Sequence, residues 1–219
     1  MSSLEPAVQG DAGPPGAAGA RDVALGYEPP AGRGERRVWI PLGGSHSAGA
    51  LGESQRKRLV SAILDVRPEP DTRLVLLGVD VDGLRPAGRA ALRDRIAFLP
   101  ADGGLLSSLN AWENIVLPIG FHHPGQLPGV AAQVKGVLEA LGADAGDLLA
   151  KLPEGMTPYE KKLTGYVRIA LENPDLVLAE EPQGGLDSAE RAAAARFPAV
   201  YLERCPGGTF VQLEVARER

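Results

Sequence analysis

The chain has 219 residues, of which 44% are hydrophobic, so it is long enough to bury a substantial core and is expected to form one domain. A formal net charge of -5 and a pI of about 5.3 exclude a broad basic surface for phosphates, so no nucleic-acid partner is expected. The single cysteine, Cys205, excludes an internal disulfide framework and is typical of a reducing compartment such as the cytoplasm.

The start of the chain is rich in glycine, proline and small polar residues. Residues 1–20 cannot bury enough apolar surface to offset the entropy of ordering, so we expect a disordered tail. The segment has neither a cationic head nor an apolar run, and is not expected to direct export. No apolar stretch approaches the ~20 residues that span a bilayer, so membrane association is expected only through a partner.

From Arg36 onward, short apolar runs alternate with longer amphipathic segments, a pattern typical of an α/β layered fold. Strands are predicted at Val38 to Leu42, Arg73 to Leu77, Ile96 to Leu99, Leu176 to Ala179, Ala199 to Leu202 and Phe210 to Leu213. Helices are predicted at Gly52 to Val66, Pro86 to Asp94, Asn110 to Phe121, Val130 to Leu141, Pro158 to Glu172 and Ser188 to Arg196.

Two predicted helices begin with strong local signals. Thr157 is an N-cap residue, followed by a proline at the first helical position and by Glu160 three residues after the cap. Asp187 and Glu190 repeat the same spacing. Between the helices, His122 and His123 lie in a Pro- and Gly-rich segment that we interpret as a surface loop without a metal.

The segment Asn173 to Asp187, NPDLVLAEEPQGGLD, resembles the Walker B and D-loop region of the ATP-binding subunits of ABC transporters. In that family an apolar strand ends in a Mg²⁺-organising aspartate and a glutamate that polarises the attacking water. The resemblance places Glu180 at the metal position and Glu181 at the catalytic position. Pro182 also fits, and Asp187 falls on the D-loop aspartate.

Two further segments resemble the family with altered residues. Leu77 to Pro118 matches its central part, but Pro100 and Ala101 stand where the family has phenylalanine and a metal-contacting glutamine. Leu152 to Leu171 matches the signature helix, yet the LSGGQ positions are occupied by Met156 to Glu160. In the family, glycine amides at these positions contact a γ-phosphate. Here larger side chains stand in their place, Pro158 has no N–H to donate, and Glu160 adds a carboxylate.

The segment Gly34 to Ser54 is similar to the family's strand and phosphate loop, G-x-x-x-x-G-K-[ST], and two registers are open. In the first, Gly44 and Gly49 fit the glycines, but Ala50 and Leu51 take the lysine and hydroxyl positions.

In the second register, which we prefer, Gly52 fits the last glycine and Ser54 the hydroxyl that would hold the metal. The lysine position is then Glu53, so neither register provides the lysine. Tyr27 matches the aromatic residue that stacks on adenine, whereas Arg204 falls on the family's switch histidine.

The resemblance implies a P-loop NTPase-like α/β fold with a mainly parallel sheet, in a domain over residues 21–219 whose helical subdomain covers about 102–171. Glu180 and Glu181 would face the glycine-rich loop. The spacing through GLLSSLNAWENIVLP resembles ATPases of lipid-trafficking importers.

The altered motifs favour a non-hydrolysing subunit, structural or regulatory, that pairs with a membrane permease and a second, competent ATPase. Its place would be the cytoplasm or the inner face of the cell membrane. The family implies ATP and Mg²⁺ as cofactors, although the altered residues argue against tight binding. Two alternatives stay open: an active ATPase with atypical motifs, and a stand-alone cytosolic interaction protein.

Overall fold

The structure is a computed structural model that describes residues 19–122 and 124–216, which divide into two compact units. The first unit contains residues 19–98, 175–178 and 206–216, and the second contains the described residues of 99–174 and 179–205. Most of the tail predicted at residues 1–20 lies outside the described residues. Its last two residues begin a short 3₁₀-helix, η1 (Gly19–Asp22).

An antiparallel sheet occupies one side of the first unit, with the strand order β2-β1-β4-β5. The first five residues of β1 are all buried, as expected for the apolar centre of a sheet. Its strands are β1 (Val23–Glu28), β2 (Val38–Pro41), β4 (Arg73–Leu76) and β5 (Val79–Asp80).

A second sheet has the order β3-β8-β7-β6, and β3 pairs with β8 in parallel. The N–H of Thr209 donates to the Asp175 carbonyl over 2.9 Å, and that of Leu176 donates to the Arg95 carbonyl over 3.1 Å. Since these residues immediately precede or begin β8, β7 and β6, the three strands run in the same direction. The strands are β3 (Gly44–Leu51), β6 (Ile96–Leu99), β7 (Leu176–Glu180) and β8 (Thr209–Val215).

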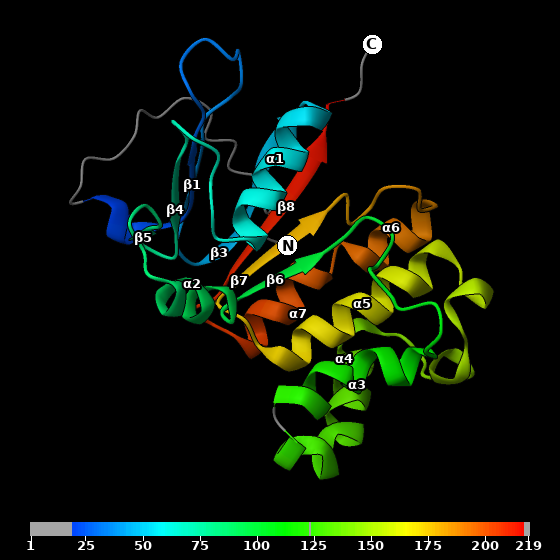
Figure 1. Ribbon diagram of the computed structural model, residues 1–219. Helices are drawn as coiled ribbons and strands as arrows, with labels where there is room; N and C mark the ends of the chain where they lie inside the picture. The colour runs from blue at the N-terminus through cyan, green and yellow to red at the C-terminus, as the bar shows by residue number, and fades with distance from the viewer. Residues whose placement is uncertain (1–18, 123, 217–219) are drawn as a thin grey trace. The chain divides into compact units, whose positions relative to one another are not determined.

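Two helices complete the first unit, α1 (Glu53–Leu64) and α2 (Pro86–Arg93). Helix α1 packs against β4 and β8, where its buried Leu59 and Ile63 join one apolar core with residues of both sheets (Figure 1). Burial of these side chains at ~1.5–3 kcal/mol each stabilises the unit.

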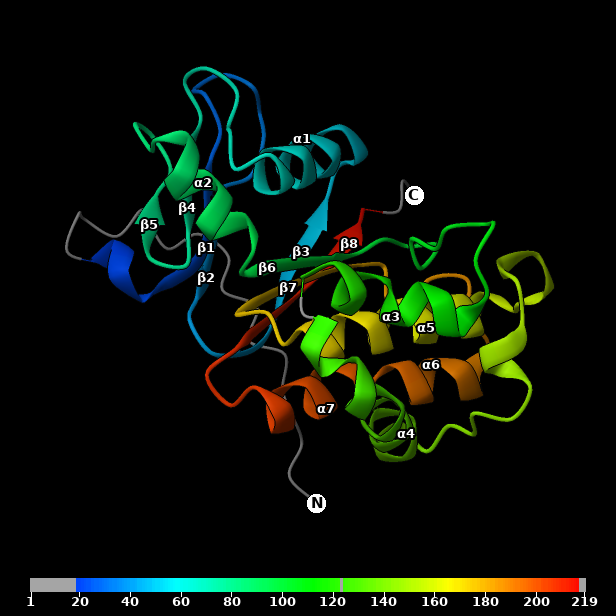
Figure 2. The same ribbon diagram turned by 60° about the horizontal axis from the view of Figure 1, so that its bottom comes forward.

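The second unit is mainly helical, and α5 is its central element, packing against α3, α4, α6 and α7 (Figure 2). The ring of Tyr166 in α5 stacks on Phe197 in α7 with centroids 4.4 Å apart. Its hydroxyl donates to the Phe197 carbonyl over 2.8 Å, so the buried oxygen is satisfied. The helices are α3 (Ala111–His122), α4 (Val130–Leu141), α5 (Pro158–Glu172), α6 (Ser188–Ala194) and α7 (Phe197–Arg204), with 3₁₀-helices η2 (Pro124–Gly129), η3 (Leu148–Ala150) and η4 (Pro153–Gly155).

Two predicted elements are wrong. Ala199 to Leu202 was predicted as a strand but lies within α7, because Phe197, Val200 and Tyr201 are buried at helical spacing. The glycine-rich stretch that was interpreted as a loop is strand β3. The other predicted strands and helices are confirmed, with ends within a few residues. None of the helices in residues 19–122 and 124–216 is long and apolar enough to cross a membrane.

Candidate functional site

The carboxyl end of β7 carries the two adjacent glutamates, and both belong to the second unit. The Glu180 carboxylate accepts a hydrogen bond from the Ala101 N–H over 3.2 Å. Glu181 has a positive φ of 39°, a conformation that non-glycine residues rarely adopt. Its carbonyl accepts the N–H of Gly184 over 2.8 Å, which closes a tight turn directly after the strand.

A buried lysine fastens this turn to α5. Lys162 is only 2% exposed, and its ammonium donates to the Glu181 carbonyl over 2.6 Å. Burial lowers the pKa of Lys162 below its ordinary value, while the Glu181 and Asp102 carboxylates act in the opposite direction. Sequence reasoning missed Lys162. The available signal was its place at helical spacing before Tyr166 and Ile169, on the apolar face of the predicted helix.

The donor set at this end of β7 does not fit a divalent cation. One Glu180 oxygen is engaged by the Ala101 amide, and the positive charge of Lys162 lies beside Glu181. Within the described parts of the chain, no group of three or more His, Cys, Asp or Glu side chains is placed to hold a metal ion. Ser54, the other predicted metal ligand, is an exposed residue of α1 in the first unit.

The positions that match the family's signature form a helix start. The Thr157 hydroxyl accepts from the Glu160 N–H over 3.2 Å, and the Glu160 carboxylate accepts from the Thr157 N–H over 2.9 Å. Lys151 also donates to Glu160 over 2.6 Å. Burial acts to raise the pKa of Glu160, but the bonds from Lys151 and the Thr157 amide prevail, and the pKa is lowered. The predicted capping box is therefore confirmed.

The predicted box at α6 is confirmed in the same way. The Asp187 carboxylate accepts the Glu190 N–H over 2.9 Å, and the Glu190 carboxylate accepts the Asp187 N–H over 3.1 Å. Asp187, which matches the family's D-loop aspartate, thus caps α6. Its role as a D-loop residue stays a prediction.

The connection between β3 and α1 contains no phosphate-type loop. Gly44 and Gly49 both lie in β3, and a register shift between Ser47 and Ala50 accommodates Gly49 at a φ of 73°. The strand runs to Leu51, so Gly52 alone connects it to α1. A cradle of backbone amides needs several loop residues, and here the amides of β3 pair with β8 instead.

The first turn of α1 carries a negative charge. Glu53, at the first helical position, bonds Lys57 over 2.6 Å, and this ion pair lowers the pKa of Glu53. A carboxylate at a helix N-terminus interacts favourably with the helix dipole, as a bound anion would. Glu53 therefore occupies, with its own charge, the end of the helix where a phosphate would be stabilised.

Tyr27 is buried and offers no stacking face. The residue is 2% exposed and belongs to the apolar core of the first unit. Its hydroxyl donates to Glu35 over 3.2 Å, and burial, followed by the Glu35 charge, raises the pKa of Tyr27 to about 12. The predicted stacking of adenine on Tyr27 is not supported, because a base could reach the ring only by opening the core.

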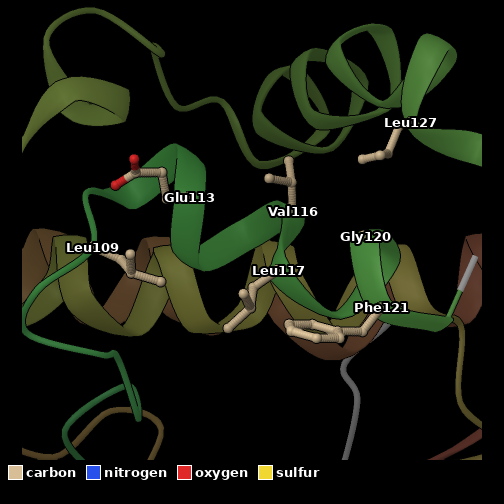
Figure 3. Close-up of a pocket in the computed structure, with 7 residues that line it drawn as sticks. All are labelled: Leu109, Glu113, Val116, Leu117, Gly120, Phe121 and Leu127. Atoms are coloured by element: carbon tan, nitrogen blue, oxygen red, sulfur yellow. The ribbon is translucent and has the colours of Figure 1, made fainter. Parts of the chain in front are cut away.

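An apolar groove of about 370 Å³ lies along α3 in the second unit (Figure 3). Phe121 is 78% exposed at one end of the groove, and Leu127 contributes from η2. Among the described residues of the lining, Glu113 is the only one with a carboxylate, and it accepts the Asn110 N–H over 2.8 Å at the start of α3. The remaining lining residues are Leu109, Val116, Leu117 and Gly120.

This architecture is that of the nucleotide-binding domains of ABC transporters. The chain aligns with cbiO1 of Clostridium perfringens with a TM-score of 0.67 at 14% identity, covering 88% of this chain and 79% of that one. It aligns with the ATP-binding cassette MJ0796 with a TM-score of 0.65 at 18% identity, covering 89% and 86%. At these identities the likeness establishes the fold, and the α/β prediction is confirmed.

Sequence identity to curated ATP-binding proteins is higher than to these solved structures. The chain is 31% identical to the lipoprotein-releasing system ATP-binding protein LolD 1 of Rhodopirellula baltica over 156 residues. This match covers 70% of this chain and 67% of LolD 1. It is 32% identical over 130 residues to LolD of Roseobacter denitrificans, covering 58% and 55%. The chain belongs to the family of ABC transporter ATP-binding proteins.

The match to larger relatives is partial. The chain is 33% identical over 114 residues to the macrolide export ATP-binding/permease protein MacB of Syntrophobacter fumaroxidans, which is 51% of this chain but only 16% of MacB. No family model matches the sequence.

Proposed function

We propose that this chain is a non-hydrolysing member of its family, a structural or regulatory subunit that works beside a membrane permease and a competent ATPase. The observation that carries the proposal is the direct passage from β3 to α1 through Gly52, with Glu53 in the first helical turn. Phosphate binding needs free backbone amides and a cation. This connection offers one glycine and a carboxylate.

Residues at the other family positions support the same proposal. At the signature positions, Pro158 has no N–H to donate and Glu160 is engaged by Lys151. At the end of β7, Ala101 contributes its backbone N–H to Glu180 and has no side-chain group to hold a metal or water. We therefore propose that ATP and Mg²⁺ bind this chain weakly or not at all.

The partner assignment rests on the relatives and on the groove along α3. MacB is named as an ATP-binding and permease protein. We propose that an apolar cytoplasmic segment of a permease contacts the groove at Phe121 and Leu127, whose exposed side chains gain from burial. The chain would then be held at the inner face of the cell membrane by that contact.

Titration calorimetry of the purified chain with Mg-ATP tests the proposal. Without the lysine and the amide cradle, a loss of ~3 kcal/mol in binding free energy corresponds to roughly a hundredfold weaker affinity. We expect no saturable heat at concentrations that saturate the R. baltica LolD 1 relative, measured beside it as a positive control. A micromolar dissociation constant for this chain would contradict the proposal and favour the active-ATPase alternative, for which the retained Glu181 is the main support.

A further inference from the structure

A short segment between β1 and β2 is bonded to the first turns of α1 in the first unit. This segment, the strap, consists of residues 33–37 and forms no helix or strand. The Arg36 N–H donates to Gln55 Oε1 over 3.1 Å, and Gln55 Nε2 donates to the Arg36 carbonyl over 2.5 Å. Gln55 is only 6% exposed. One buried side chain thus satisfies both backbone groups of Arg36, as a neighbouring strand would.

Two further contacts join the strap to β1, α1 and β3. The Glu35 carboxylate, 8% exposed, accepts the Tyr27 hydroxyl over 3.2 Å and forms an ion pair with Arg58 of α1. The Arg36 guanidinium donates to the Ala50 carbonyl over 3.1 Å. The strap therefore lies against the Tyr27 hydroxyl and against the end of β3. These are the places that match the adenine and phosphate positions of the family.

Polar contacts alone hold the strap closed. Residues 31–37 are exposed apart from Glu35, and none of the buried apolar side chains of the core lies in this range. Gly32 and Gly34 have φ values of 88° and 68°, which glycine adopts without strain, so the backbone here is easily rearranged. Opening the strap breaks hydrogen bonds and ion pairs, whereas unfolding the unit also exposes its apolar core. Segments with so few buried apolar contacts open locally at a lower free energy than the whole fold.

We propose that the strap is an autoinhibitory contact: it closes the Tyr27 hydroxyl and the end of β3 to ligands, and it opens without unfolding of the unit. Gln55 is the latch that holds it closed. This inference rests on the proposed function, because the family's nucleotide position gives the covered residues their meaning. It adds that a segment of the chain itself occupies this position, beside the altered motif residues.

Amide hydrogen exchange of the full chain, read by NMR, tests whether the strap opens by itself. The Arg36 amide reports the latch, because it donates to Gln55. In the wild type we expect it to exchange at least roughly a hundredfold faster than the amides that pair β1 with β4, at a rate that urea below the unfolding transition leaves unchanged. If the Arg36 amide exchanged as slowly as those amides, with the same dependence on urea, the proposal would be overturned.

Gln55→Met tests the latch. Methionine keeps the length and the helix propensity of glutamine but removes both hydrogen bonds to Arg36. The Arg36 amide should exchange at least roughly tenfold faster in this variant than in the wild type. Ser61→Ala, at an exposed position of the same helix, should leave the rate unchanged. Equal rates in the wild type and Gln55→Met would overturn the role of Gln55.

A milder substitution covers the case in which Gln55→Met does not fold. The Arg58 side chain is 32% exposed, and Arg58→Met removes only its ion pair with Glu35. The Arg36 amide should then exchange at least roughly threefold faster than in the wild type. An unchanged rate would contradict the part that Glu35 plays in holding the strap.

Acetylation by N-acetylimidazole, followed by mass spectrometry, tests whether the strap controls access. This reagent acetylates free tyrosine hydroxyls, and the Tyr27 hydroxyl is bonded to Glu35 while the strap is closed. Tyr27 should be acetylated at least roughly tenfold faster in Gln55→Met than in the wild type, and Ser61→Ala should match the wild type. Equal rates in Gln55→Met and the wild type would show that the strap does not close this position. Because no nucleotide is present, these outcomes decide on the strap alone, and tight Mg-ATP binding would refute the proposed function independently.

Discussion

Replacing Gly165 by alanine tests how closely α5 packs on the turn that follows β6. Gly165 lies in the interior of α5, where alanine normally stabilises a helix by ~1 kcal/mol relative to glycine. Here an added Cβ would lie 2.3 Å from the Gly103 carbonyl oxygen and 2.9 Å from Leu99 Cδ1. Ordinary contacts begin near 3.4 Å, so the turn or the helix must shift by about an ångström.

The surroundings resist that shift. The turn is bonded to Arg168 of α5 through the Gly104 carbonyl. The backbone of Gly103 also lies close to the Lys161 carbonyl of α5, since a Cβ on Gly103 would be 2.4 Å from that oxygen. Overpacking of a well-filled interior costs ~1–3 kcal/mol, and loss of the hydrogen bond to a charged group adds ~1.5–3 kcal/mol where the turn moves. These terms exceed the gain of ~1 kcal/mol in helix propensity, so Gly165→Ala should destabilise the fold by ~1.5–5 kcal/mol.

Gly136→Ala is the matched control, because Gly136 lies inside α4 and an added Cβ would meet nothing within 4 Å. That variant should gain ~1 kcal/mol. Urea unfolding followed by circular dichroism compares the two variants with the wild type, and their midpoints should move in opposite directions. If Gly165→Ala were as stabilising as Gly136→Ala, the close approach of α5 to the Gly103 carbonyl would be refuted.

Three further predictions concern turnover, docking and pH. In an assembled complex, Glu181→Gln in this chain should leave ATP turnover nearly unchanged, whereas the equivalent change in the partner ATPase should abolish it; a comparable loss from Glu181→Gln alone would show that this site is catalytic. Phe121→Asp should weaken co-purification with a tagged permease at least roughly tenfold, while Leu64→Asp, at an exposed residue of α1, should not weaken it. Equal effects of the two substitutions would show that the groove does not contact the permease. The pKa of Tyr27 is raised from 10.0 to about 12, so between these pH values the folded state keeps the Tyr27 proton while the unfolded state loses it. The stability that Tyr27 contributes is therefore complete below pH 10 and is lost as the pH rises towards 12. Tyr27→Phe should remove this part of the alkaline loss, on the order of 2–3 kcal/mol, in urea unfolding across that range, and an unchanged alkaline slope would contradict burial of the hydroxyl.

Local signals in the sequence were reliable wherever the relevant partners lie a few residues apart. The capping boxes at Thr157 and Asp187 were predicted because the cap and its glutamate are three residues apart. Strand β7 was predicted because its first four residues, Leu176 to Ala179, form a continuous apolar run, and all four are buried. These features depend on nearest neighbours along the chain.

Strand β3 could not be predicted for the opposite reason. GSHSAGAL consists mainly of glycine, serine and alanine, Leu51 is its one large apolar residue, and glycine weakens strands in isolation. Its partner strand β8 lies about 165 residues later, and directly before β3 the Gly43 N–H donates to the Thr209 hydroxyl across a separation of 166 residues. The prediction of a phosphate loop failed here, because a glycine-rich pattern does not report a partner strand so far along the chain.

The residues at the positions that match the family's ligand-binding groups bond to other groups inside the chain. Glu53 bonds Lys57, Glu160 bonds Lys151, and the Glu180 carboxylate accepts the Ala101 N–H. The exposed Glu53–Lys57 pair contributes little, but a ligand that approached Glu160 or Glu180 would have to break a partly buried hydrogen bond. Each such loss costs ~1–3 kcal/mol before the ligand makes any contact, and two of them lower affinity by roughly thirtyfold or more. The weak nucleotide binding that we propose would thus follow both from the missing lysine and from the internal bonds at the family's ligand-binding positions. Restoring a single family residue is for that reason not expected to restore ATP binding.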